Sequence, residues 1–347
     1  MAEQRKSFLF LSHDNKIGDA IVLTGLLAPI KARWPNARIG VVCGQSNAVV
    51  YRAHPLVDFL HVTRSRSLLA RMLAGLSARC KAYGQLVHFG SDVDSRSLRT
   101  LVGLAGAAEC VLFFEPVRPL AAQQQVLAGD WLQRHVSTRH LRYLQWLDIQ
   151  PETYTYDLRL SPSDVLEAAQ FLQNANNPMP NAQLVIACDA STDDKSLPVQ
   201  WVIQCCDQLL ARNPELHITL LCAGGQRRNN FEDALRTLSE KSPTTTSIRL
   251  LPIRETAGLA LALIAKADLL LSADTFAVHA ASAFNVPVLA VYPGGAPGLV
   301  TWAPRSNQFK QLTAQAGQPV ETIEPNMASA VCSELLQQSR ASKPLSP

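Results

Sequence analysis

The stretch that decides the fold lies near the C-terminal end, where residues 267–304 read ADLLLSADTFAVHAASAFNVPVLAVYPGGAPGLVTWAP. Its opening apolar segment predicts a strand buried on both faces, and the following Asp274 and Thr275 are residue types that begin helices. Segment 276–284 predicts a helix that can lie close against a sheet, because it is rich in alanine. Segment 286–292 then predicts a second strand, which ends at a Pro-Gly-Gly loop.

A strand, turn and helix of this kind gather polar groups at the carboxyl end of a parallel strand. Asp274 supplies a carboxylate, Thr275 supplies a hydroxyl, and the helix start supplies backbone N–H groups. Open α/β sheets bind ligands at these strand ends, and helix N-termini favour anions. We therefore expect a ligand there that carries phosphate or sugar.

Strand-like and helix-like segments alternate twice along the chain, which predicts an α/β protein with two parallel sheets and right-handed crossovers. The length of 347 residues fits two domains, and 47% apolar residues suffice for two buried cores. The predicted strands are 7–12, 38–43, 58–62, 85–89 and 109–114, then 183–188, 216–222, 247–251, 267–273 and 286–292. The predicted helices are 19–33, 67–83, 95–106 and 129–147, then 199–212, 229–241, 255–266, 276–284 and 325–340.

The expected boundary between the two halves is segment 148–162, which contains two prolines and little helical periodicity. We therefore expect domains at residues 1–160 and 161–324, followed by a C-terminal helix and tail at 325–347. Two Rossmann-like halves in tandem are expected to face each other across a cleft.

Charge and cysteine patterns narrow the possible partners and the compartment. Segment 64–142 contains eleven arginines and lysines against five acidic residues, so it either faces an anionic partner or forms a solvated basic surface. The eight cysteines show no CxxC pair and no metal-ligand spacing, which predicts free thiols in a reducing cytosol. Residues 1–6 do not read as a signal peptide, and polar residues interrupt the longest apolar region, 269–292, so no transmembrane segment is expected.

The turn after the first predicted strand, Asn15-Lys16-Ile17-Gly18-Asp19, holds the candidate catalytic residue. Asp19 stands at a helix start at the carboxyl end of that strand, where a carboxylate can serve as a general base. The alternative is that Asp19 only caps the helix.

Several function classes lack their sequence requirements. The first turn does not contain G-x-G-x-x-G, and the chain has no G-x-x-x-x-G-K-[ST] motif, which disfavours nicotinamide enzymes and P-loop hydrolases. Aromatic residues make up only 6% and do not alternate with basic ones, so no nucleic-acid partner is expected. Asp92-Val93-Asp94 has the spacing of a metal-binding pair but lies in the first half of the chain, away from the ligand expected near Asp274, and no metal ligand is assigned.

Three segments together resemble glycosyltransferase family 9, the bacterial lipopolysaccharide heptosyltransferases. The first is the strand, loop and Ile-Gly-Asp at the N-terminus, with the Trp-Pro-Asn-Ala-Arg-Ile segment 34–39 behind it. The second is segment 187–198, ACDASTDDKSLP, and the third is the Asp-Thr-(three residues)-His pattern of 274–279 followed by 286–288, Pro297 and Trp-Ala-Pro. The resemblance extends in order over nearly the whole chain.

This resemblance implies a GT-B fold, with an acceptor site on the first domain and a nucleotide-sugar site on the second. The implied reaction is inverting transfer of a heptose from ADP-heptose to a hydroxyl of the lipopolysaccharide inner core. The implied partners are the nucleotide-sugar donor and an anionic lipopolysaccharide-core acceptor, without a tightly bound cofactor and with metal dependence open. The implied location is the cytoplasm, including the cytoplasmic face of the inner membrane as a peripheral protein.

Site residues follow from the resemblance position by position. Asp19 matches the catalytic base of the family. The donor site would be formed by Ser191, Thr192, Lys195, Asp274, Thr275 and His279, with Lys195 on the donor phosphates. His279 on its alanine-rich helix is either a donor ligand or a packed residue.

The chain departs from the family pattern at four places. Phe276 follows the Asp-Thr pair where glycine is usual, His13 replaces an arginine, Leu197 precedes Pro198 in place of tryptophan, and segment 224–226 offers no acid to the ribose. Two alternatives therefore stay open. One is a member of the family that uses another nucleotide sugar or acceptor, and the other is a catalytically weakened member that acts as a binding protein.

Overall fold

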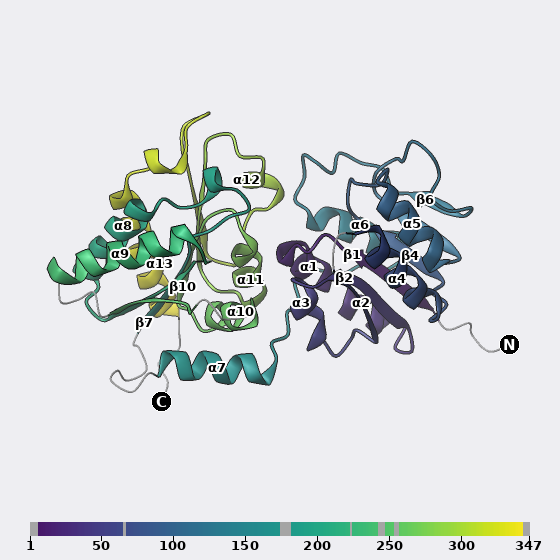
Figure 1. Ribbon diagram of the computed structural model, residues 1–347, viewed down its shortest axis with the longest axis horizontal. Helices are drawn as coiled ribbons and strands as arrows, with labels where there is room; N and C mark the ends of the chain where they lie inside the picture. The colour runs from purple at the N-terminus through teal and green to yellow at the C-terminus, as the bar shows by residue number, and fades with distance from the viewer. Residues whose placement is uncertain are drawn as a thin grey trace. The chain divides into compact units, whose positions relative to one another are not determined.

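The computed structural model describes residues 6–64, 67–173, 182–222, 224–241, 247–252 and 257–342. The chain folds as two units that meet in sequence between Arg159 and Leu160, and each unit contains one six-stranded parallel sheet (Figure 1). The first residues of the helix predicted at 255–266 and the tail from residue 343 lie outside the described residues.

The first unit contains a sheet of order β3-β2-β1-β4-β5-β6. All its neighbouring strands pair in parallel, which confirms the predicted sheet type. Its elements are β1 (Ser7–Ser12), α1 (Ile17–Thr24), α2 (Leu27–Arg33), β2 (Arg38–Gly44), α3 (Ala48–Arg52), β3 (Phe59–Thr63), α4 (Leu68–Arg79), β4 (Gln85–His88), α5 (Arg96–Ala105), β5 (Glu109–Leu112), β6 (Gln124–Val126) and α6 (Ser137–Trp146).

The second unit repeats this strand order, with β12-β11-β10-β7-β8-β9 also in parallel. Its elements are α7 (Pro162–Leu172), β7 (Ala182–Ala187), α8 (Val199–Arg212), β8 (Leu216–Leu221), α9 (Gln226–Lys241), β9 (Ile248–Leu250), α10 (Ala257–Ala265), β10 (Leu269–Ser272), α11 (Phe276–Phe284), β11 (Val288–Tyr292), α12 (Gly298–Thr301), β12 (Phe309–Thr313) and α13 (Pro325–Ser342).

The central strand β1 shows why these segments form the middle of a sheet. All six of its residues are buried. Leu9 and Leu11 pack into the cluster formed with α4 and α5, whereas the ring of Phe10 meets Tyr143 of α6 edge-on at 6.1 Å. Since side chains alternate between the faces of a strand, helices cover both faces of this sheet.

The prediction of one continuous helix at 19–33 is wrong, because the segment forms two helices, α1 and α2, that are interrupted at Gly25. The backbone of segment 154–157 packs against this point. The Tyr154 hydroxyl donates to the Val22 carbonyl at 2.7 Å, and Thr24 Oγ1 accepts from the Asp157 amide at 2.9 Å. A Cβ at Gly25 would lie 2.6 Å from Tyr154, so this close approach requires glycine.

The helix predicted at 129–147 is also wrong over its first eight residues, since α6 begins only at Ser137. Trp131 folds back over Gly129, where a Cβ would lie 2.6 Å from its ring, and its indole N–H donates to the Leu127 carbonyl at 3.0 Å. Burial of this indole in a turn therefore outweighs the local helical pattern. Elements that the sequence pattern missed are α3, β6, α7, α12 and β12, and most of these are short or polar.

The second unit follows the sequence prediction more closely. Helices α8 and α11 have the predicted bounds, and α13 extends two residues beyond its predicted end. Helix α13 packs on α8 within this unit. Arg212 donates to Ser329 Oγ at 3.1 Å, and the Trp201 indole donates to the Ile323 carbonyl at 2.6 Å.

The eight cysteines are free; Cys80 is exposed, Cys222 is partly buried, and the other six are buried. None of the helices over the described residues is both long and apolar enough to cross a membrane.

Buried histidines make the stability of the first unit sensitive to acid. Burial lowers the pKa of His61 to about 4 and that of His140 to about 3, and it also lowers the pKa of His54 and His88. A histidine that is neutral when folded but protonates near pH 6.5 when unfolded makes the folded state less stable as pH falls below 6.5. For His61 and His140 this loss is on the order of 1.4 kcal/mol each at pH 5.5.

Asp19 of the same unit acts in the opposite direction, because its pKa is raised to about 7, but four histidines outweigh one carboxyl group. We therefore expect the melting temperature of the first unit to fall between pH 7.5 and pH 5.5 in scanning calorimetry. His61→Gln removes one titrating group and should flatten this dependence. A melting temperature that stays constant or rises over this range would contradict the explanation.

Candidate active site

The candidate residues lie where the strand order reverses in each sheet. In the first unit this place is between β1 and β4, and in the second it is between β7 and β10. Neighbouring loops separate there at the carboxyl ends of the strands, which is where sheets of this order bind ligands. Asp19 follows β1, Lys195 follows β7, and Asp274 follows β10.

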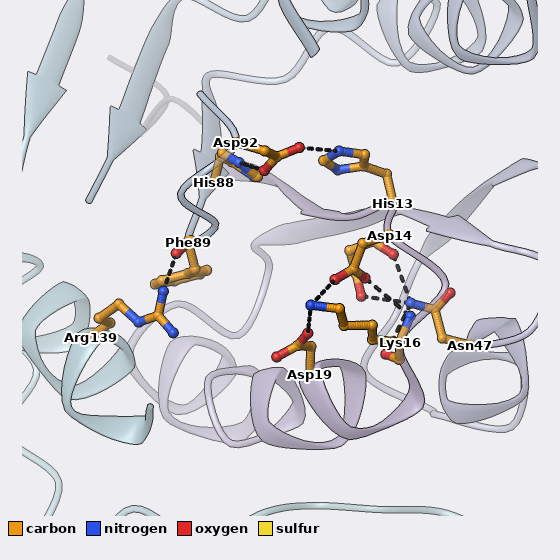
Figure 2. A network of polar contacts seen from close by, with 10 residues as sticks. His13, Asp14, Lys16, Asp19, Asn47, His88, Phe89, Asp92 and Arg139 are labelled. Atoms are coloured by element: carbon orange, nitrogen blue, oxygen red, sulfur yellow. Dashed lines mark hydrogen bonds and ion pairs between the residues drawn. The ribbon is translucent and has the colours of Figure 1, made fainter. Parts of the chain in front are cut away.

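Asn47 holds the turn after β1 in place. Its buried Nδ2 donates to the Ser12 carbonyl at 2.7 Å, to Ser12 Oγ at 3.0 Å and to the Lys16 carbonyl at 3.4 Å (Figure 2). Asn15 adopts a left-handed conformation with φ of 66°, and its Oδ1 would lie 1.8 Å from a Cβ at Gly44. The turn can therefore approach β2 so closely only because position 44 is glycine.

Asp19 lies in the first turn of α1, whose N-cap residue is Lys16, so Asp19 does not occupy the N-cap position itself. Lys16 Nζ lies 3.7 Å from a carboxylate oxygen of Asp14 and 3.7 Å from one of Asp19 (Figure 2). The Asp19 side chain retains 27% exposure, which leaves it accessible to a reactant.

The pKa of Asp19 is raised to about 7, chiefly by burial and secondly by the negative charge of Asp14. Lys16 and Arg139 of α6 act in the opposite direction. Arg139 is held in place because its Nη1 donates to the Phe89 carbonyl at 2.5 Å (Figure 2). A carboxylate with a pKa near the working pH is suited to accept a proton during a reaction.

A histidine cluster that the sequence analysis did not identify lies beside this turn. Asp92 joins His13 of the turn to His88 at the end of β4, with distances of 3.3 Å and 2.9 Å to the two Nε2 atoms (Figure 2). Hydrogen bonds from His13 and His88 hold the pKa of Asp92 well below its usual range. An ionised carboxylate only accepts hydrogen bonds, so both imidazoles carry their proton on Nε2.

This cluster explains two features noted in the sequence. His13 departs from the family pattern that the sequence analysis describes, and it binds a carboxylate of its own unit. Asp92 of the Asp-Val-Asp segment is held by two imidazoles, and Asp94 pairs with Arg99 at 2.7 Å. Among the described residues, no group of three His, Cys, Asp or Glu is arranged to hold a metal.

In the second unit, Lys195 and Asp274 lie close together in the loops that follow the neighbouring strands β7 and β10. Lys195 Nζ lies 3.6 Å from Asp274 Oδ2. Lys195 closes the short helix η1 (Asp193–Lys195), and Ser191 and Thr192 are exposed in the same loop. Loop β7–α8 therefore places Lys195 beside Asp274, and Ser191 and Thr192 are exposed a few residues before Lys195 in the same loop.

Two residues that sequence reasoning missed hold this loop. Ser196 Oγ accepts from the Ala190 amide at 2.9 Å and donates to the Thr192 carbonyl at 3.1 Å. Arg227 of α9 donates to Asp189 Oδ1 at 2.6 Å and also to the Leu197 carbonyl. The separation of Arg227 from the loop by 30 residues or more leaves no sequence signal for this contact.

Helix α11 begins behind Asp274 with an open first turn. Thr275 is the N-cap residue in extended conformation, and its side chain makes no capping hydrogen bond. Phe276, the first helical residue, is half-buried, and the alanines that follow face the core. Backbone N–H groups in this turn can therefore meet an anionic ligand.

His279 does not lie in the open part of this turn. It is buried, and its ring meets Trp302 edge-on at 5.5 Å. These contacts fit the packed role that the sequence analysis left open for His279. Gly298 of α12 completes the surroundings of Asp274, because a Cβ there would lie 2.6 Å from Asp274 Oδ2.

Comparison with known proteins gives the family. The model of glycosyltransferase family 9 (heptosyltransferase) matches residues 118–327, more than half of the chain. The chain belongs to this family. It is accordingly a glycosyltransferase, as predicted from the three resembling segments. A comparison with curated protein sequences found no match.

Solved structures confirm the expected α/β fold of GT-B type. E. coli ADP-heptose lps heptosyltransferase II matches with a TM-score of 0.76 and 18% identity over 96% of this chain and 99% of that chain. A family 9 glycosyl transferase from Veillonella parvula matches with a TM-score of 0.79 and 14% identity, covering 97% and 99%. E. coli heptosyltransferase WaaC with ADP matches with a TM-score of 0.72 and 18% identity, covering 95% and 99%.

The influence of Asp14 on Asp19 can be measured directly. Asp14→Asn removes the neighbouring negative charge and should lower the pKa of Asp19 from about 7 to roughly 6. The measurement is a pH titration of the Asp19 carboxyl carbon by NMR. Asp94→Asn, which changes a carboxylate paired with Arg99 in the same unit, is the matched control. An Asp19 titration unchanged by Asp14→Asn would contradict the assigned electrostatics.

Proposed function

We propose that the protein transfers a heptose from ADP-heptose to a hydroxyl of the lipopolysaccharide inner core, with inversion at the anomeric carbon. The observation that carries this proposal is Asp19, a partly exposed carboxylate of raised pKa at the strand reversal of the first unit. Membership of a heptosyltransferase family supports the choice of sugar. Residues 1–160 would hold the acceptor, and residues 161–324 would hold the donor.

Asp19 would act as the general base. It takes the proton of the acceptor hydroxyl while that oxygen attacks the anomeric carbon and the bond to the diphosphate breaks. Arg139 and Lys16 favour the ionised form of Asp19 before the reaction, since both oppose the rise of its pKa. The cluster of His13, Asp92 and His88 keeps the adjoining turn in place.

The donor diphosphate would bind at Lys195 and the N-terminus of α11. Lys195 would exchange its contact with Asp274 for the phosphates, because a doubly charged group attracts it more strongly than one carboxylate. Ser191 and Thr192 would donate hydroxyl hydrogen bonds to the same group. The leaving ADP is then stabilised by a positive charge and by helix N–H groups.

Asp274 and its neighbours would recognise the sugar or the ribose. A carboxylate repels phosphate, so Asp274 is suited to accept hydrogen bonds from hydroxyl groups. Thr275 provides a hydroxyl beside it, and His279 would support the site from within through its contact with Trp302. Neither a tightly bound cofactor nor an assigned metal ligand is part of this proposal.

The acceptor would be anionic and would bind near the basic residues of the first unit. Inner-core sugars carry acidic groups, and arginine is suited to bind them. The E. coli relative that resembles this chain is described as an ADP-heptose lps heptosyltransferase, which favours the same donor and acceptor here. Such an acceptor would place the protein in the cytoplasm at the inner face of the membrane.

A second candidate rests on Phe276. This half-buried ring occupies the first position of α11, where the family pattern has glycine. A side chain there restricts how closely a diphosphate approaches the backbone. This observation favours a different nucleotide sugar or acceptor, or a family member of weak activity that acts as a binding protein.

Replacement of the base separates these candidates. Asp19→Asn should reduce transfer from ADP-heptose about 100-fold or more, the usual contribution of a general base, while ADP binding stays unchanged. The measurement is release of ADP with a lipopolysaccharide inner-core acceptor. If the wild-type protein shows no transfer or hydrolysis with any ADP- or UDP-sugar, the binding-protein candidate replaces the enzyme proposal.

The donor site is tested by binding alone. ADP should raise the melting temperature, by stabilisation of about 2.7 kcal/mol at one hundred times its dissociation constant, whereas UDP should not. Lys195→Met should weaken ADP binding tenfold or more, because a charge-assisted hydrogen bond is lost. Lys310→Met, on the exposed strand β12 of the same unit, is the matched control. Equal ADP affinity in both variants would contradict the assignment of Lys195.

A further inference from the structure

Helix α4 turns its large apolar side chains away from the core. Leu68, Leu69, Leu73 and Leu76 are 42%, 65%, 59% and 44% exposed. Positions 69, 73 and 76 follow each other at spacings of four and three residues, so these leucines share one face of the helix.

The buried face of the same helix is formed mainly by small residues. Ala74, Gly75 and Ala78 are buried there, and a Cβ at Gly75 would lie 2.9 Å from Leu104 of α5. Helix α4 can therefore pack closely on α5 without using its leucines. Clustered exposed leucines on a folded protein indicate a surface that binds a partner protein or a membrane.

The chain segment that contains this leucine face carries charge of one sign. From Phe59 to Ser91 the chain has no aspartate or glutamate, but it contains five arginines and lysines. Arg64 precedes the helix and Arg79 ends it, and both are exposed. Lys81 lies next to the helix end, with its Nζ 4.2 Å from the centre of the Phe59 ring.

We propose that the leucine face of α4, Leu68 to Leu76, docks on a lipid bilayer with anionic headgroups. The leucines enter the boundary between headgroups and acyl chains, and Arg64, Arg79 and Lys81 contact lipid phosphates. Long basic side chains suit this arrangement because their stems stay in apolar surroundings while their charges reach water and phosphate. The proposal adds a membrane contact to the protein and does not rest on the proposed transfer reaction.

A second copy of the chain fits this face less well. A two-fold symmetric contact would bring the leucines together, but it would also bring Arg79 and Lys81 close to the same residues of the other copy. No acidic residue of segment 59–91 is available to neutralise them. One face of a three-turn helix is also smaller than the roughly 800 Å² that each partner of a stable dimer buries.

Co-sedimentation with vesicles tests this proposal without donor or acceptor. The full-length protein should bind vesicles of phosphatidylglycerol and phosphatidylethanolamine at least tenfold more strongly than vesicles of phosphatidylcholine, and high salt should weaken the binding. The double variant Leu69→Glu, Leu73→Glu should lose this binding. Leu166→Glu, at a position of α7 that is 60% exposed, is the matched control and should keep it.

Fluorescence provides a second readout for the case in which the double variant does not fold. Leu73→Trp should show a blue-shifted emission when anionic vesicles are added, and Leu166→Trp should not. Absence of vesicle binding by the wild-type protein, or unchanged binding by a folded double variant, would overturn the proposal. Self-association that the double variant abolishes, in the absence of vesicle binding, would overturn it in favour of a second copy. All these outcomes leave the ADP-binding and transfer tests unaffected.

Discussion

The structure depends on one constraint, which is that each sheet is parallel and covered on both faces. Strands such as β1, β10 and β11 have no exposed residue, and their side chains are apolar except at the strand ends. Most of the polar groups of the candidate residues therefore lie beyond the strand ends, where helix starts and loops can satisfy them. The strand order reverses once in each unit, and sheets of this order bind ligands at such a reversal.

The candidate residues of each unit lie on loops that hydrogen bonds hold in place. Asn47 holds the first turn with several hydrogen bonds, and Arg227 holds the loop of Lys195 in the second unit. Asp19 instead destabilises the fold when it is ionised, because its pKa is raised to about 7. The free energy of unfolding therefore decreases as pH rises from about 4, near the pKa of an aspartate in the unfolded chain, toward 7. A carboxylate retained despite this cost is typical of a functional position.

Much of the fold could be predicted from sequence, because apolar runs, turn residues and helix periodicity agree. Helix α11 is the best example. Thr275 precedes it, and Asn285 ends it in a left-handed conformation with φ of 55°, a backbone geometry that asparagine tolerates. The helix predicted at 129–147 failed in its first part because tertiary packing of Trp131 on Gly129 overrides the local pattern. Strand β12 was missed because an exposed edge strand carries polar residues and no alternating pattern.

Candidate site residues could be predicted from the sequence only where a local motif follows a predicted strand. Lys195 and Asp274 each follow a strand, and because β7 and β10 are parallel neighbours, Lys195 Nζ lies 3.6 Å from Asp274 Oδ2. The contact of His13 with Asp92 spans 79 residues, and no local pattern marks it. Contacts of this kind follow from the strand order, which a sequence without aligned relatives does not reveal.

The most direct test of this account is a crystal structure of the protein with ADP bound. The account predicts the diphosphate within hydrogen-bonding distance of Lys195 Nζ and of the backbone N–H groups that begin α11. A diphosphate bound away from both groups would show that the reversal between β7 and β10 is not the donor site, and would contradict the central claim.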